Sequence, residues 1–342
     1  MLEAEDQNGW LSLPLDFVRR LAPDRSAKLS SSARRQAIVL LAAVLKCGWL
    51  DASDELCISR ISVLTEPLHA ASGSPEDELH LEILVHVVEQ FSPRHDTTRI
   101  GLPVEAHLAT AATFQNLALP RIFHAAGCLL DVFNAAPTLD SPRTVIRLAN
   151  LFELILEWNF DLPSIAAAPG SSRALQTSSS SCPLLPPQEW WEVILCDPFI
   201  TAIFALYRRC ADASPATHLR NLILRLSSLD VARMVADAGS DVLAFAGHID
   251  ALLLAHIFEI LARSGPEPEV LAMAEAISNV VVHGTWATLT AAPDAEATLA
   301  SMCELTRSLL VAASGDDLDD EWLFEAYDHL HVAWVHMATS TD

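Results

Sequence analysis

Apolar residues recur at helical spacing along most of this chain. The clearest stripes comprise Val145, Leu148, Phe152 and Ile155, then Val242, Phe245, Ile249, Leu252, Leu253, Ile257 and Leu261, and finally Leu323, Ala326, Leu330, Ala333 and Met337. Steps of three or four residues place these side chains on one face of an α-helix. No segment shows sustained alternation of apolar and polar residues, which a half-buried strand would need. The pattern therefore predicts an all-α fold.

Helix boundaries are marked by capping residues and prolines. Several pairs place a capping side chain directly before a proline suited to the first helical position. These pairs are Ser74-Pro75, Ser141-Pro142, Asp197-Pro198 and Ser214-Pro215. We expect helices near 32–47, 53–72, 75–91, 104–116, 118–136, 142–159, 188–195, 198–211, 215–229, 240–264, 267–283, 294–313 and 319–338. Pro67 and Pro120 should bend or break the helices that contain them.

The spacing of these helices predicts how they are arranged. Alternate helices start near residues 33, 75 and 118, and again near 215, 266 and 319. Paired helices that repeat every ~40–47 residues are typical of HEAT and armadillo arrays, in which each hairpin packs on the next. Such an array suits 342 residues, because a single core supports only roughly 250–300. We therefore predict an α-solenoid of HEAT-like hairpins, with an irregular two-domain helical bundle as the alternative.

One stretch interrupts the helices. Residues 161–187 are rich in Pro, Ala and Ser and have too few large apolar side chains to bury themselves. We expect a flexible loop there, either a tolerated insertion or a segment regulated by phosphorylation. Residues 1–160 would then form the first part of the array and residues 188–342 the second part of the same array.

Charge restricts the kinds of partner. The chain has 44 acidic and 21 basic residues, a net charge of −23, which repels the phosphate backbone and argues against nucleic-acid binding. The basic residues crowd the beginning, at Arg19, Arg20, Arg25, Lys28, Arg34 and Arg35, whereas the end is strongly acidic. Both charged regions are either solvated faces or contacts with a charged protein. Before the last helix, a candidate partner-contact patch comprises Asp316, Asp317, Asp319, Asp320 and Glu321.

Cysteine usage and hydropathy indicate a compartment. The chain has seven Cys without paired spacing, which favours reduced intracellular thiols. Acidic residues precede any apolar run at the N-terminus, unlike a secretory signal. The longest strongly apolar run, Ala37 to Leu45, is shorter than the ~20 residues of a membrane span. We expect a soluble protein of the nucleus or cytoplasm, without membrane insertion.

Candidate catalytic groups are few. His95 and Asp96 form a pair that helical metal phosphohydrolases use, but the pair lies in a loop without further ligands at suitable spacing. The histidines at 329, 331 and 336, and those at 248 and 256, are more typical of structural positions. Nucleophile-elbow, phosphate-loop and zinc-site motifs are absent. We therefore expect a protein that is not an enzyme and has no cofactor, metal or small-molecule substrate.

Several stretches together resemble one family. Two lie early in the chain: Lys46, Gly48, Leu50 and Asp51, and then Ile100-Gly101-Leu102 with Glu105, His107 and Ile122-Phe123. Two lie on either side of the predicted loop: Trp158-Asn159-Phe160, and then Leu184-Leu185 with Pro187, Glu189, Trp191 and Leu195. The last is Glu325-Ala326-Tyr327-Asp328 with Leu330 and Trp334. Their sequence and order are similar to the exportin 4 branch of the karyopherin-β nuclear transport receptors. The matches span roughly Phe17 to Trp334. Within this pattern, Glu192 stands where the family has Arg.

This resemblance implies a HEAT solenoid that binds the GTP form of Ran together with protein cargo and shuttles between nucleus and cytoplasm. Nucleoporins are further candidate partners. The family chain is longer, so the resemblance covers an internal segment of its N-terminal half, and we expect a partial or truncated receptor. Two alternatives remain: a HEAT-repeat protein-binding scaffold without Ran dependence, and a helical hydrolase that uses His95 and Asp96.

Overall fold

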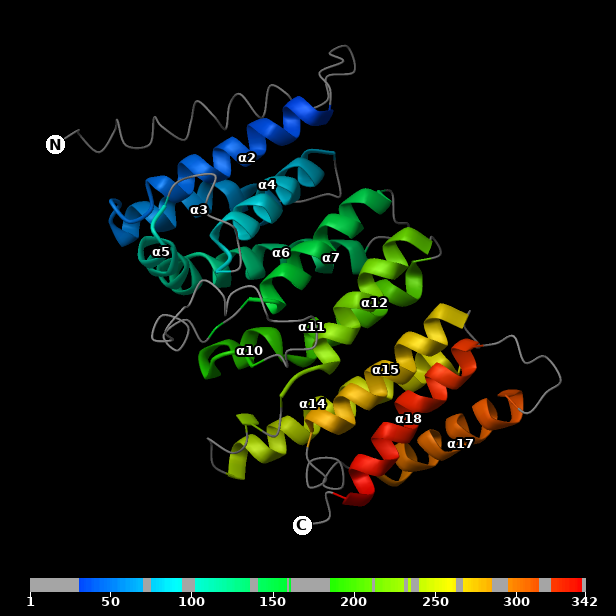
Figure 1. The fold of residues 1–342 in the computed structure, drawn as a ribbon. Helices are drawn as coiled ribbons and strands as arrows, with labels where there is room; N and C mark the ends of the chain where they lie inside the picture. The colour runs from blue at the N-terminus through cyan, green and yellow to red at the C-terminus, as the bar shows by residue number, and fades with distance from the viewer. Residues whose placement is uncertain are drawn as a thin grey trace. The chain divides into compact units, whose positions relative to one another are not determined.

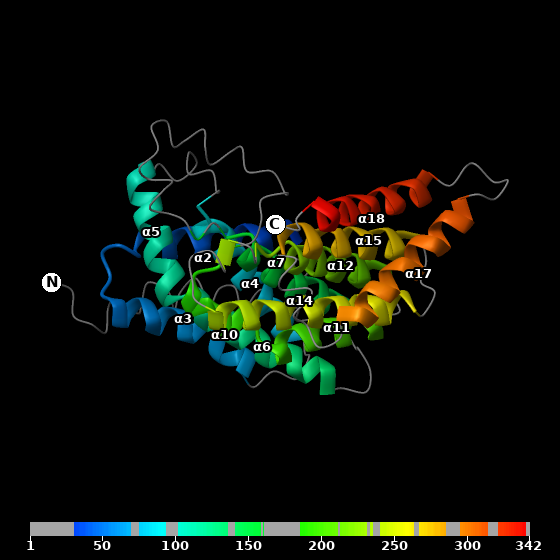
Figure 2. The ribbon, with the colours of Figure 1, turned by 90° about the horizontal axis from the view of Figure 1, so that it is seen from below.

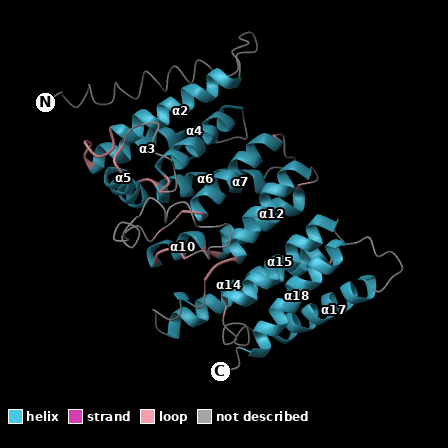
Figure 3. Cartoon of the chain, viewed as in Figure 1, coloured by secondary structure: helices cyan, strands magenta, loops and turns pink. Residues whose placement is uncertain are grey.

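The fold is helical throughout the part of the chain that the structure describes. The computed structural model describes residues 31–69, 75–93, 102–135, 141–158, 160, 185–210, 213–230, 233–234, 240–262, 267–284, 295–313 and 321–339. Within these ranges helices are joined by short loops and no strand occurs (Figure 3). The predicted all-α fold is confirmed for these residues.

The chain divides into two compact units, Met1–Ser178 and Ser179–Asp342. The division falls inside the loop predicted at 161–187, of which residues 161–184 lie outside the described ranges. Each unit has its own set of fully buried aliphatic and aromatic side chains.

The first unit has two rows of helices. Its helices are α2 (Ser31–Cys47), α3 (Asp54–His69), α4 (Pro75–Phe91), α5 (Val104–Leu117), α6 (Leu119–Ala135) and α7 (Pro142–Leu156). In one row α2 packs on α4 and α4 packs on α7, and in the other α3 packs on α6 (Figure 1). Contacts of α3 with α4 and of α6 with α7 join the rows, and α5 packs against α3, α4 and α6.

The second unit is a stack of helical hairpins. Its elements are the 3-10 turn η1 (Gln188–Trp190) and the helices α10 (Trp191–Ile194), α11 (Asp197–Arg209), α12 (Ala213–Ser227), α14 (Ser240–Leu261), α15 (Glu267–His283), α17 (Ala295–Ala313) and α18 (Glu321–Thr339). Successive helices pair as α11 with α12, α14 with α15, and α17 with α18. First helices stack on first helices, α11 on α14 and α14 on α17, while second helices stack as α12 on α15 and α15 on α18 (Figure 2).

Helix starts and breaks follow the predicted signals only in part. Ser141 caps α7, because its hydroxyl accepts a hydrogen bond from the Thr144 backbone N–H at 3.4 Å. Pro120 does not break the helix that contains it, because it lies in the first turn of α6, just after the break at Ala118 that separates α5 from α6. Pro67 does not break α3, which continues to His69.

Two predicted caps are wrong. The residue that caps α11 is Cys196, whose carbonyl accepts hydrogen bonds from Phe199 and Ile200, and the Asp197 carboxylate instead contacts His248. Ser214 lies inside α12, which already begins at Ala213. Ser74 lies outside the described residues.

An aromatic cluster forms part of the first unit's core. Trp49 follows α2, Phe91 ends α4, Phe114 lies in α5 and Trp158 follows α7, and all four are buried. Ring centroids are 5.0 Å apart for Trp49 and Phe91, 4.1 Å for Phe91 and Phe114, and 5.9 Å for Phe114 and Trp158. Such pairs contribute about 0.5–1.5 kcal/mol each beyond the area that they bury. The cluster therefore ties distant parts of this unit together.

Helix α14 is the most apolar helix in the described chain that is long enough to span a membrane. Its window Ala244–Leu261 meets the length and composition of a membrane span, and 44% of the window is buried. This window is longer than the apolar run Ala37 to Leu45 and contains two acidic residues, Asp250 and Glu259, and two histidines. The helices α11, α15 and α17 pack on α14, and the core helix of a soluble protein can meet the same criteria.

Candidate functional site

A groove lined by arginines lies on the first unit, beside the row α2, α4 and α7. Its volume is about 610 Å³, and its lining comprises Ser32, Arg34, Arg35, Glu82, Val85, His86, Arg143 and Arg147. The arginines come from the first two turns of α2 and α7, while Glu82, Val85 and His86 come from α4. The packing of these helices side by side brings the two pairs of arginines together.

Glu82 holds two of these arginines in place. Its carboxylate Oε2 lies 2.9 Å from Arg34 Nη2 and 3.1 Å from Arg147 Nη2, and only 7% of its side chain is exposed. Arg147 Nε also lies 3.4 Å from Glu78 Oε1. Because a guanidinium is charged at every physiological pH and presents a rigid fork of donors, these ion pairs fix the wall of the groove.

The other two arginines are available to a partner. Arg35 and Arg143 are both exposed, and neither forms an ion pair with another described side chain. Four guanidinium groups against the single lining carboxylate of Glu82 leave an excess of positive charge. Guanidinium groups bind carboxylates and phosphates through paired hydrogen bonds. Within a chain of net charge −23, this groove is a local concentration of positive charge.

The sequence identifies two of the four arginines that line this groove. Arg34 and Arg35 belong to the basic run at the beginning of the chain, which suggested contact with a charged protein. The sequence does not point to Arg143 and Arg147, because nothing near them in the chain connects them with residues more than a hundred positions earlier. Their spacing of four residues, one turn of a helix, was the available signal.

The second unit exposes apolar side chains on its last hairpin. Phe324, Val332 and Val335 of α18 and Leu310 and Val311 of α17 are between 47% and 61% exposed. The three residues of α18 are spaced by eight and three positions, so they lie along one face of the helix. Grouped exposed apolar residues mark candidate surfaces for protein contact.

The acidic patch predicted before the last helix lies mostly outside the described residues. This holds for Asp316, Asp317, Asp319 and Asp320. Glu321 is described, is exposed and begins α18. A carboxylate at this position interacts favourably with the helix dipole.

The family-matching tryptophans pack into the helical units. Trp158 is buried and its indole N–H donates to Gln115 Oε1 at 3.0 Å. Trp191 donates to the Pro186 carbonyl at 2.9 Å and stacks on Phe245 at 6.4 Å between centroids. Trp334 of α18 donates to Thr306 Oγ1 of α17 at 3.0 Å. Each of them therefore contributes to the structure of its unit.

The remaining family-matching residues are more varied. Phe160 is partly buried, Asn159 lies outside the described residues, and Glu189 belongs to η1 without a described side chain. On α18, Glu325 and Asp328 are exposed. Tyr327 stacks on His331 with centroids 6.1 Å apart. Glu325 and Asp328 thus lie on a surface where a partner could reach them.

His248 and His256, two of the histidines considered as candidates for chemistry, make structural contacts. His248 Nε2 lies 2.8 Å from Asp197 Oδ2 and so links α14 to α11. The ring of His256 stacks on Phe204 at 4.9 Å between centroids. Burial, and then the charge of Arg208, lower the pKa of His256. His95 and Asp96, the pair considered for a hydrolase, lie outside the described residues.

The groove and the exposed apolar face are both suited to protein contact, one through charge and one through apolar area. The residues that resemble the exportin branch are distributed between the two units. Comparison with models of protein families finds none that matches this chain.

Proposed function

We propose that this protein is a helical-repeat receptor of the exportin 4 type, an α-solenoid of HEAT-like hairpins that binds Ran-GTP and protein cargo. The observation that supports this most strongly is the packing of the second unit, in which first helices contact first helices and second helices contact second helices. In an array of this kind each hairpin presents similar faces to its neighbours and offers an extended surface to a partner. The ordered motifs from Lys46 to Trp334 connect this architecture with nuclear transport.

In this proposal binding is coupled between partners. Ran-GTP and cargo would each stabilise one curvature of the superhelix, so that each raises the affinity for the other. The receptor would then shuttle through the nuclear pore, with nucleoporins as further partners. The arginine-lined groove is the proposed contact for an acidic segment of the cargo, since Arg35 and Arg143 are exposed there.

A pull-down tests the transport function. The full product of the natural transcript is incubated with Ran locked in its GTP form and with Ran bound to GDP, with an established exportin in parallel. The proposal expects capture of the GTP form alone. Absence of capture, while the established exportin binds, would overturn it.

The scaffold without Ran dependence is the second candidate. It is favoured by the helix packing of the second unit and by the exposed apolar side chains of α17 and α18. Both features suit a protein partner whose binding does not depend on a nucleotide. The scaffold predicts protein binding that is equal with either nucleotide on Ran. The pull-down therefore separates the two functions directly.

The groove has a test of its own. Replacing Arg35 and Arg143 with Glu should weaken the binding of an acidic cargo segment and make the remaining binding less sensitive to salt. Arg121→Glu is the matched control, because Arg121 is an exposed arginine of the same unit that does not line the groove. Equal binding by all variants would exclude the groove as the contact.

A further inference from the structure

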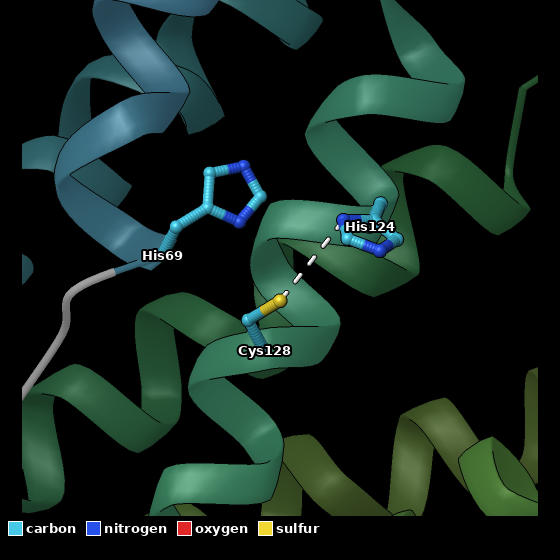
Figure 4. Close-up of side chains that lie close together, drawn as sticks. All are labelled: His69, His124 and Cys128. Carbon is cyan, nitrogen blue, oxygen red and sulfur yellow. Dashed lines mark hydrogen bonds between the residues drawn. The ribbon is translucent and has the colours of Figure 1, made fainter.

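A cluster of metal-ligating side chains lies at the junction of α3 and α6. His69 is the last residue of α3, while His124 and Cys128 lie one turn apart on α6 (Figure 4). One ligand atom from each of the three residues lies within 4.8 Å of the others. His124 Nδ1 is 4.0 Å from Cys128 Sγ, and the rings of His69 and His124 are 5.5 Å apart between centroids. We propose that these three residues bind one Zn²⁺ ion.

The positions of the ligands favour a shared metal. His124 and Cys128 are spaced by four residues, which places both side chains on the same face of a helix. The packing of α3 on α6 brings His69 to that face from a separate element. His69 and His124 are exposed and Cys128 is partly exposed, so an ion can reach the site without opening the core.

The geometry needs only a small adjustment to close on the ion. In a tetrahedral site with Zn–N near 2.0 Å and Zn–S near 2.3 Å, neighbouring ligand atoms are about 3.3–3.6 Å apart. The ligand atoms here lie up to 4.8 Å apart, so the site closes when the side chains move by roughly one ångström. Exposed side chains at the surface of two helices can make this change by rotating about their χ angles.

The ligand types select the ion. Two imidazole nitrogens and one thiolate are a borderline-soft set that suits Zn²⁺ rather than Mg²⁺ or Ca²⁺, which take oxygen ligands. On binding, the Cys128 thiol loses its proton to solvent and the thiolate forms a bond to the metal, so binding releases one proton. Three protein ligands leave the fourth coordination position for water.

A bound ion would change the first unit. It would tie the C-terminal end of α3 to α6, across more than fifty residues of chain. Because the unfolded chain does not hold these three side chains together, the ion would stabilise the folded state according to its concentration relative to its Kd. It would also convert Cys128 from a free thiol into a ligand that electrophiles cannot reach.

The test is titration of the reduced, metal-free 342-residue chain. Zn²⁺ binding is measured by calorimetry, and Co²⁺ is added in parallel because a tetrahedral cobalt site with thiolate ligation gives visible and near-ultraviolet absorption bands. We expect one ion per chain, a thiolate-to-cobalt band, and a rise in the thermal midpoint of the first unit on adding Zn²⁺. Absence of saturable Zn²⁺ uptake would overturn the proposal.

Substitutions assign the site. Cys128→Ser, His124→Asn and His69→Asn should each weaken Zn²⁺ binding by more than about 10-fold, because even partners outside the ligand set contribute about 10- to 100-fold. Cys303→Ser and His331→Asn are the matched controls, since both residues are exposed in the other unit and should leave binding unchanged. If Cys128→Ser bound Zn²⁺ like the parent chain, this assignment would be wrong.

Thiol labelling provides a second measurement that does not depend on any variant. Saturating Zn²⁺ should slow the alkylation of Cys128 while leaving that of Cys47 and Cys303, both exposed, unaffected. Peptide mapping assigns the label to each cysteine. Equal labelling of Cys128 with and without Zn²⁺ would contradict ligation by its sulfur.

Discussion

Lys46 is one of only two lysines in the chain, and it is buried. Its ammonium donates a hydrogen bond to the backbone carbonyl of Gln90 at the end of α4 and lies 6.0 Å from the centroid of the Phe91 ring. Burial lowers the pKa of Lys46 to about 8. The hydrogen bond thus helps to hold α2 and α4 together, while burial makes the charged form of Lys46 less favourable.

This position gives the chain a specific dependence on pH. The unfolded chain, with a lysine pKa of 10.5, binds more protons than the folded chain between pH 8 and pH 10.5. The contribution of Lys46 to the free energy of unfolding therefore rises with pH across this interval, and its burial penalty is fully present below pH 8. Urea unfolding of the parent chain and of Lys46→Met at several pH values measures this contribution.

Between pH 8 and pH 10.5, we expect the free energy of unfolding of the parent to increase relative to that of the variant. A difference that stays constant across the interval would contradict the lowered pKa.

Gly284 follows α15 in a tightly packed position. A Cβ added there would lie 2.6 Å from the Val280 carbonyl oxygen and 3.0 Å from Asp250 Oδ2 of α14. Since the first of these is a backbone atom, Gly284→Ala should reduce the free energy of unfolding of the second unit by about 1–3 kcal/mol.

Gly127→Ala is the comparison. Apart from its chain neighbours and the backbone of its own helix, no atom lies within 4 Å of a Cβ at this position inside α6, so alanine should raise stability by about 0.5–1 kcal/mol. Chemical denaturation of both variants checks the opposite signs, and a neutral Gly284→Ala would show that α14 and α15 pack more loosely than described.

At the scale of elements, most of the fold was predictable and the candidate sites were not. The helical stripes and proline signals located the described helices to within a few residues because both are local properties of the sequence. The Asp197 cap failed because a tertiary contact with His248 takes its carboxylate. The arginine-lined groove and the His69, His124 and Cys128 cluster depend on which helices pack together, and local spacing does not specify that.

A substitution of Glu82 tests whether its ion pairs with Arg34 and Arg147 stabilise the packing of α2, α4 and α7. Replacing it with Gln keeps its shape but removes the charge that pairs with Arg34 and Arg147. The first unit should lose about 1–3 kcal/mol of stability, because the two guanidinium groups lose the nearby negative charge that compensates them. Thermal or urea unfolding measures the loss.

Glu89→Gln is the matched control on the same helix. Its side chain is 43% exposed and pairs only with His86 among the described residues, so the change should stay within about 0.5 kcal/mol. Equal effects of the two substitutions would mean that the ion pairs of Glu82 do not stabilise the packing of α2, α4 and α7.

At the scale of the whole molecule, two helical units flank a division in the Pro, Ala and Ser-rich stretch. The helix contacts of the second unit are compatible with the predicted repeat of hairpins, whereas the first unit has two rows with an additional helix, α5. The second unit exposes an apolar face and the first an arginine-lined groove, so each offers its own surface to protein partners. The sequence could not specify these surfaces, because residues from separate helices form them.

The central claim, a receptor whose binding depends on the nucleotide state of Ran, is tested most directly by the affinity for Ran in its two forms. The Kd of the full natural product for Ran-GTP and for Ran-GDP is measured at equilibrium, with and without an acidic cargo segment. We predict a Kd for Ran-GTP at least about 10-fold lower than for Ran-GDP, and lower again with cargo, as expected for a coupling of 1–3 kcal/mol. Equal affinity for the two forms would contradict the account and leave a scaffold without Ran dependence.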